Sequence, residues 1–149
     1  MLLDALLAWL HFGLIFTLAG CLFAEVFFYR DVLSGPTFAR LRSVDRAYGI
    51  VAGLVIVSGI LRLIYSPKTA GYFLHNPIFW TKMALFAAVA LLSIPPTIHF
   101  LRLGATGLAD GTIRIERGAY ARTRALLALE VALLMLIPLC AALMARGFH

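Results

Sequence analysis

The sequence predicts an all-α integral membrane protein in which residues 1–149 form a single antiparallel bundle of four transmembrane helices. The first observation is composition, because 62% of the residues are hydrophobic and only 13% are charged. Soluble domains are about 45–50% apolar and about 25% charged. The second observation is a set of four long apolar segments, which use almost the whole chain. The composition therefore argues against a soluble globular protein and leaves no room for a second domain.

The four apolar segments cover about residues 6–29, 47–65, 77–101 and 120–145. Each is near or above the ~20 residues that a helix needs to cross ~30 Å of hydrocarbon. Because the bilayer interior offers no water to the backbone, a helix is the expected form for every segment.

Basic residues are unevenly distributed over the connections, and this predicts the orientation. The first connection contains Arg30, Arg40, Arg42 and Arg46, and the third contains Arg102, Arg114, Arg117, Arg122 and Arg124. The middle connection contains Lys68, with Arg62 just inside the preceding segment. The positive-inside rule places the first and third connections in the cytoplasm and both termini outside, in a bacterial inner membrane. The formal charge of +6 therefore indicates lipid headgroups and topology rather than nucleic acid.

A cluster of cations and histidines is expected near the outer face. Helix rise places His11 about two turns and Lys82 about one turn from that face, with Arg62 near the outer end of its segment. His75, in the outer connection, is expected just above them, and Lys68 is counted with the cluster. Like charges in a low-dielectric site repel each other, and an anionic or metal-bearing ligand would resolve the conflict. A haem fits, with His11 as an axial ligand, Lys82 as a second ligand or proton donor, and Arg62 and Lys68 at the propionates. The alternative is that the cations reach the headgroups and His11 is a hydrogen-bonded core residue.

A second polar layer is expected near the cytoplasmic face, formed by Glu25, His99 and Glu130. Carboxylates with a histidine are typical of divalent-metal sites and proton relays. For Glu25 we favour pairing with nearby arginines, and for Glu130 a functional or bundle-specifying role. His99 is open between a second haem ligand, a proton relay and a partner of Glu130.

Two local patterns predict features of the helices. Gly49 and Gly53 form a GxxxG pair that permits close helix approach, and packing within the chain is favoured over dimerisation. Pro95-Pro96 removes two backbone donors and predicts a kink near the cytoplasmic end of its helix.

Short motifs around these polar residues resemble a known family. His11 follows Ala8-Trp9-Leu10, and Lys82 follows Phe79-Trp80-Thr81 in a helix that ends near His99. This pattern resembles the HemJ-type protoporphyrinogen oxidases and, more loosely, the membrane domain of CopD-type copper-resistance proteins. The resemblance covers about the first two thirds of the chain. It implies haem b binding, with His11 and Lys82 as the key functional residues and His99 at a position where many members have a histidine.

Other stretches depart from the HemJ pattern. These are Ser93-Ile94-Pro95-Pro96-Thr97 and Glu130, for which the HemJ type has no counterpart. Together with Asn76-Pro77-Ile78-Phe79-Trp80-Thr81-Lys82, the first stretch is similar to a family of short bacterial predicted membrane proteins. We therefore infer a relative of the HemJ type.

The sequence thus predicts a membrane protein that binds haem b between the first and third helices and has a redox role. The absence of CxxCH excludes covalent c-type haem, and no nucleotide motif is present. Two alternatives remain: a protoporphyrinogen IX oxidase-like enzyme, and a proton or divalent-metal transport or metal-binding protein using Glu25, His99 and Glu130. A purely structural or assembly role is a further alternative. The expected partners are the lipid bilayer, a membrane or periplasmic redox protein, and a second copy in a homo-oligomer.

Overall fold

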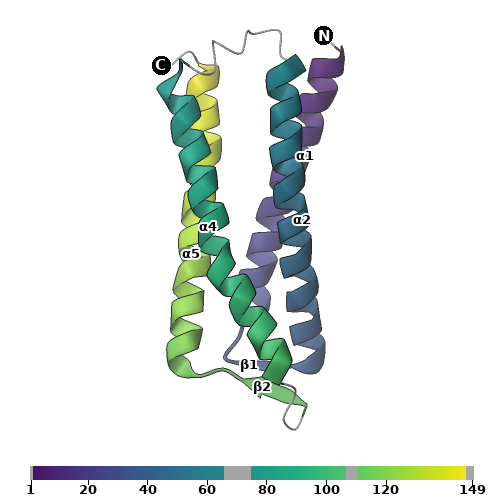
Figure 1. Ribbon diagram of the computed structural model, residues 1–149, viewed down its shortest axis with the longest axis vertical. Coiled ribbons are helices and arrows are strands. Elements are labelled where there is room, and N and C mark those ends of the chain that lie inside the picture. Colours follow the sequence, from purple (N-terminus) through teal and green to yellow (C-terminus); the bar gives the residue numbers. More distant parts are fainter. Residues whose placement is uncertain (1, 66–74, 107–110, 147–149) are drawn as a thin grey trace.

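The computed structural model describes residues 2–65, 75–106 and 111–146, and it confirms an all-helical fold (Figure 1). The elements are α1 (Leu2–Phe28), β1 (Val32–Ser34), α2 (Gly35–Tyr65), α4 (Pro77–Thr106), β2 (Thr112–Arg114) and α5 (Arg117–Ala145). Each of the four helices is long and apolar enough to cross a membrane. Their exposed apolar side chains, such as Phe16 and Ile64, suit a lipid environment.

The helices are arranged as two pairs. α1 packs along α2 and α4 packs along α5, and the two pairs are joined mainly through α1 and α5. Both termini lie at one end of the bundle and the two strands lie at the other (Figure 1). α4 continues through Pro95 and Pro96 and runs obliquely towards the N-terminal end of α2 (Figure 1). It thereby brings polar residues of α4 towards α2 near the strand end.

The second helix begins earlier than the sequence predicted. It starts at Gly35 rather than near residue 47, so Arg40, Arg42 and Arg46 lie on α2 and not in a loop. Hydropathy detects only the apolar part of a helix, and in these first turns the arginines and Asp45 offset apolar residues such as Leu41. Pro36 lies in the first turn, where a missing backbone donor costs little.

Two short strands close the end that carries the basic residues. β1 and β2 pair antiparallel with Leu33 opposite Ile113, and both side chains are buried. The strands have three residues each, too few for an alternating pattern to be recognised in the sequence. Gly111, immediately before β2, has a φ of +74°, a backbone conformation that favours glycine.

Aromatic packing fixes the helices above this strand pair. The ring of the fully buried Tyr29 stacks on Tyr120 of α5, with 5.3 Å between the ring centroids, and contacts Phe100 of α4. Its hydroxyl forms a hydrogen bond of 3.0 Å with Nε2 of His99. The strand end of the bundle is therefore tied together across α1, α4 and α5.

The prediction that Gly49 and Gly53 support helix packing within the chain is wrong. Both glycines are exposed, and a Cβ atom added at either would meet no atom within 4 Å. The GxxxG pair therefore faces away from the α1–α2 contact.

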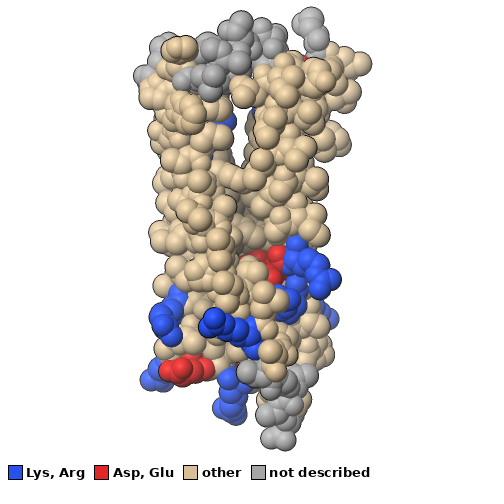
Figure 2. Space-filling view, in the orientation of Figure 1, with Lys and Arg blue, Asp and Glu red and all other residues tan. Residues whose placement is uncertain are grey.

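The distribution of charge predicts which end is cytoplasmic. Lys and Arg side chains gather at the strand end of the molecule (Figure 2). Because the ends of membrane helices that are rich in Lys and Arg remain in the cytoplasm, the strand end is expected to be cytoplasmic.

Cysteine labelling tests this orientation. In a cysteine-free Cys21→Ala/Cys140→Ala background, Ser34→Cys should resist a membrane-impermeant maleimide in intact cells and react after permeabilisation. Asp4→Cys should react in intact cells. The reverse labelling pattern would contradict this orientation.

Candidate functional site

His11 is held in one orientation in the half of the bundle that contains the termini. Its Nδ1 lies 2.8 Å from Oγ of the buried Ser58, on the neighbouring helix α2. The Ser58 hydroxyl donates a hydrogen bond to the backbone carbonyl of Val55, with 3.0 Å between the two oxygens. A hydroxyl has one proton, so with that proton directed to the Val55 carbonyl, Ser58 Oγ accepts from His11 Nδ1–H. In this arrangement the imidazole proton is on Nδ1 and Nε2 carries the lone pair.

The His11 ring lies close against α2. A Cβ atom at Gly59 would lie 3.3 Å from Cε1 of His11, so any larger residue would crowd the imidazole. Within the described part of the chain, no hydrogen bond engages Nε2 of His11. The serine and the glycine together position the ring and leave this nitrogen without a protein partner there.

Two cations lie in the same half of the bundle. Cζ of Arg62 is 5.4 Å from the centre of the Phe12 ring, and Nζ of Lys82 is 5.3 Å from the centre of the Phe79 ring. Both lie within electrostatic range of His11. Among the described residues, neither forms an ion pair, and Nε of Arg62 is buried without a hydrogen-bond partner. His11, Arg62 and Lys82 of the expected cluster therefore lie within electrostatic range of one another, and neither cation forms an ion pair among the described residues.

The structure describes one of the two further residues of the predicted outer cluster, His75. His75 is exposed, two residues before the start of α4. Lys68 lies outside the described residues.

A hollow separates the two helix pairs in this half. Figure 2 shows it as an opening between the α1–α2 and α4–α5 pairs, on the side of the termini. His11 belongs to one pair and Lys82 to the other. His11 and Lys82, the two residues expected to be functionally most important, therefore lie on opposite helix pairs.

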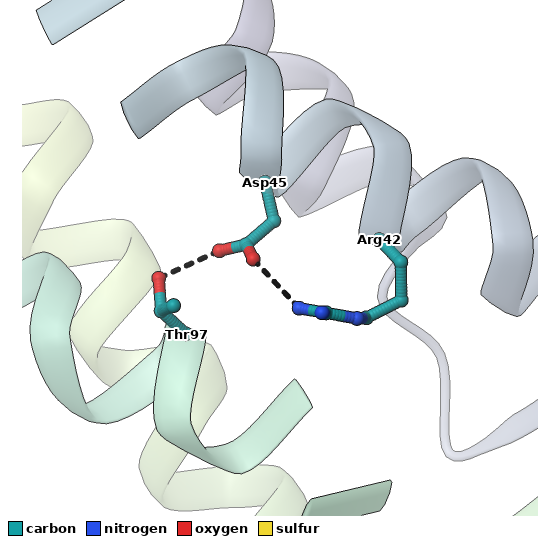
Figure 3. A network of polar contacts seen from close by, with 3 residues as sticks. All are labelled: Arg42, Asp45 and Thr97. Atoms are coloured by element: carbon teal, nitrogen blue, oxygen red, sulfur yellow. Dashed lines mark hydrogen bonds and ion pairs between the residues drawn. The ribbon is translucent and has the colours of Figure 1, made fainter. Parts of the chain in front are cut away.

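The second polar layer is built around Asp45, which is 6% exposed. Nη1 of Arg42 lies 3.0 Å from one carboxylate oxygen of Asp45, and Oγ1 of Thr97 donates to the other at 2.6 Å (Figure 3). Arg42 and Asp45 belong to α2 and Thr97 to α4, so the network joins the two helix pairs. A fully hydrogen-bonded carboxylate with an arginine partner satisfies the requirements of a buried charge.

Glu25 and Glu130 are buried beside this network, with 3% and 0% exposure. The hydroxyl of Tyr48 donates to Oε2 of Glu130 at 3.5 Å, but Oε1 of each glutamate has no hydrogen-bond partner among the described residues. The predicted pairing of Glu25 with an arginine is therefore wrong. The arginines nearby cap the end of α1 instead, since Arg30 donates to the Phe27 carbonyl and Arg124 to the Val26 carbonyl.

His99 is not assembled with the two glutamates. Its Nε2 bonds to the Tyr29 hydroxyl, and no group of three His, Cys, Asp or Glu side chains suited to a metal is found in the described ranges. The structure therefore does not bring Glu25, His99 and Glu130 together as a metal site.

A cavity of about 410 Å³ lies between α2 and α4. Asp45, Tyr48 and Thr97 line it together with apolar residues such as Phe86 and Val89. Because the Tyr48 hydroxyl also bonds to Glu130, this side chain connects the cavity with the buried glutamates.

Sequence reasoning missed the roles of several residues that hold the two sites. On α2 a signal was present for Arg42, Asp45 and Tyr48, which follow one another at intervals of three residues. Thr97 on α4 offered no such signal, because one threonine in an apolar helix is common.

The comparisons with known proteins identify a family. A family model described as a predicted membrane protein, DUF2214, matches residues 3–149, and the chain belongs to this family. This confirms the expected similarity to short predicted membrane proteins. No curated protein and no solved structure matches the chain. The resemblance to HemJ-type and CopD-type proteins therefore rests on the short motifs around His11 and Lys82.

Loss of Arg42 is expected to destabilise the bundle, because Asp45 would remain buried without its cation. Removing one partner of a buried ion pair costs about 3–5 kcal/mol of stability. Because the Arg42 side chain is 24% exposed, the loss of stability in Arg42→Gln should be at or below the lower end of this range. The double variant Arg42→Gln/Asp45→Asn should recover part of the loss. Thermal unfolding in detergent measures the effect, with Arg40→Gln on the exposed face as control. Equal midpoints for Arg42→Gln and Arg40→Gln would contradict this role.

Proposed function

We propose that this member of the DUF2214 family is a membrane haem b protein with a redox role, and that His11 is an axial ligand of the iron. The observation that carries the proposal is the hydrogen bond between His11 Nδ1 and Ser58. A histidine that binds a metal through one ring nitrogen commonly donates a hydrogen bond from the N–H of the other to a fixed acceptor, which sets the tautomer and the ring orientation. The lone pair on Nε2 of His11 then suits an iron ligand.

The charge around His11 supports an anionic cofactor. Arg62 has no carboxylate partner in the described part of the chain, and its Nε is buried without a hydrogen-bond partner there. An unpaired cation in a low-dielectric site is costly. The propionates of a haem would supply the missing negative charge. Lys68 and His75 remain further candidates for this cofactor-binding role.

The hollow between the helix pairs supports the expected position of the cofactor, between α1 and α4 (Figure 2). Lys82 would serve there as the second ligand or as a proton donor. His99 is less suited as a ligand, because its Nε2 is engaged by Tyr29. When bound, the haem would carry the electron, and the burial and axial ligands provided by the protein would set its potential.

Visible spectra of the detergent-purified protein, before and after dithionite, test this proposal. The wild type should show a Soret band with sharp reduced α and β peaks, and His11→Ala should lose them. His99→Ala should retain the bands as the matched histidine control. A preparation that stays colourless after addition of haemin would overturn the haem proposal, as would a His11→Ala variant with wild-type spectra.

The role of Ser58 gives a separate prediction. Ser58→Ala removes the acceptor for His11 Nδ1–H, and loss of such a partner typically lowers metal affinity by about 10–100-fold. Ser93→Ala is a matched control, because Ser93 also bonds to a carbonyl three residues earlier in its helix but contacts no histidine. Titration of the haem-free protein with haemin measures both affinities. Equal affinities in the two variants would contradict a positioning role for Ser58.

A protoporphyrinogen oxidase-like activity is the second candidate. It is favoured by the juxtaposition of His11 and a Lys82 that lacks a carboxylate partner within the described residues. Expression of the wild type in a bacterial strain lacking that step would then restore growth, and Lys82→Ala would not. Failure of the wild type to rescue growth, with haem spectra intact, would favour a non-enzymatic redox role in the bacterial inner membrane.

A further inference from the structure

Two buried glutamates of the inner layer are not used by the proposed haem site. Glu25 lies on α1 and Glu130 on α5, two helices that pack against each other. They are 3% and 0% exposed, and each has one carboxyl oxygen without a hydrogen-bond partner in the residues that the structure describes. An unsatisfied buried carboxyl is costly and indicates a missing partner.

Three arginines at the strand end of the bundle have partners other than these glutamates. Arg42 pairs with Asp45, while Arg30 and Arg124 donate to backbone carbonyls at the end of α1. No ion pair joins Glu25 or Glu130 to a basic side chain in the described ranges. If both were ionised, the bundle would hold two uncompensated negative charges in a low-dielectric interior, which is unfavourable.

We infer that Glu25 and Glu130 form an exchangeable proton-binding site inside the bundle, loaded from the α2–α4 cavity through Tyr48. The cavity is lined by Tyr48, whose hydroxyl bonds to Glu130. A proton entering from cavity water would be taken up by the Tyr48 hydroxyl as that hydroxyl passes its own proton to Glu130. Charge is conserved in this exchange, and Glu130 ends as a carboxylic acid beside Glu25.

The surroundings favour a proton over a metal ion. Hard divalent cations take about six or more oxygen ligands, and no group of three metal-ligating side chains is found among the described residues. Asp45 and Tyr48 from α2 and Cys21 from α1 lie within electrostatic range of the pair. On α4, Thr97 bonds to Asp45 and His99 bonds to Tyr29 rather than to either glutamate. This site stands whether or not a haem binds in the other half.

Infrared spectroscopy of the detergent-purified full chain at neutral pH tests the inference, because a protonated carboxyl has a C=O stretch distinct from that of a carboxylate. The wild type should show this band, and it should shift on transfer to D₂O. Glu25→Gln and Glu130→Gln should each reduce or remove it, since an amide mimics the protonated acid and preserves the packing. Glu116→Gln, at an exposed position, is the matched control and should leave the band unchanged.

Tyr48→Phe tests the route separately from the site. This variant should keep the carboxylic acid band but exchange its proton for deuterium several-fold more slowly than the wild type. Absence of the band in the wild type, or its persistence unchanged in both glutamine variants, would overturn the proton site. Exchange at the wild-type rate in Tyr48→Phe would overturn the path through Tyr48.

Discussion

The constraint on which the rest of this structure depends is the low dielectric of the membrane interior. Within the bilayer, a buried polar side chain needs a protein partner, a ligand or a proton, because no water replaces the missing interaction. Asp45 meets this requirement through Arg42 and Thr97. Among the described residues, Nε of Arg62 and Oε1 of Glu130 are buried without a hydrogen-bond partner. The haem proposal follows from the first and the proton-site proposal from the second.

The two ends of the bundle meet the constraint differently. At the strand end, the Tyr29–Tyr120 stack, the β1–β2 pair and the bonds to Asp45 tie the helix pairs together. At the end with the termini, the pairs are separated by a hollow (Figure 2). This asymmetry leaves the closed end suited to internal proton storage and the open end suited to a bulky cofactor.

The sequence predicted the fold well because membrane insertion is governed by apolar length, which hydropathy measures directly. It failed where polar turns extend a helix, as at the start of α2 near Arg42, and where strands are too short to show alternation. The candidate site was predicted in part. The sequence indicated His11, Lys82 and Glu130, but their partners Ser58 and Tyr48 depend on how α2 is rotated against its neighbours, which requires the packed structure.

Chemical rescue tests the central claim, ligation of haem iron by His11, most directly. The substitution His11→Gly removes the imidazole and leaves space beside Gly59 and Ser58 for a small molecule. Purified His11→Gly with haemin should lack the low-spin wild-type spectrum, and free imidazole should restore it as a saturable function of concentration. A wild-type spectrum in His11→Gly without imidazole would contradict the account, as would a wild-type protein that takes up no haem.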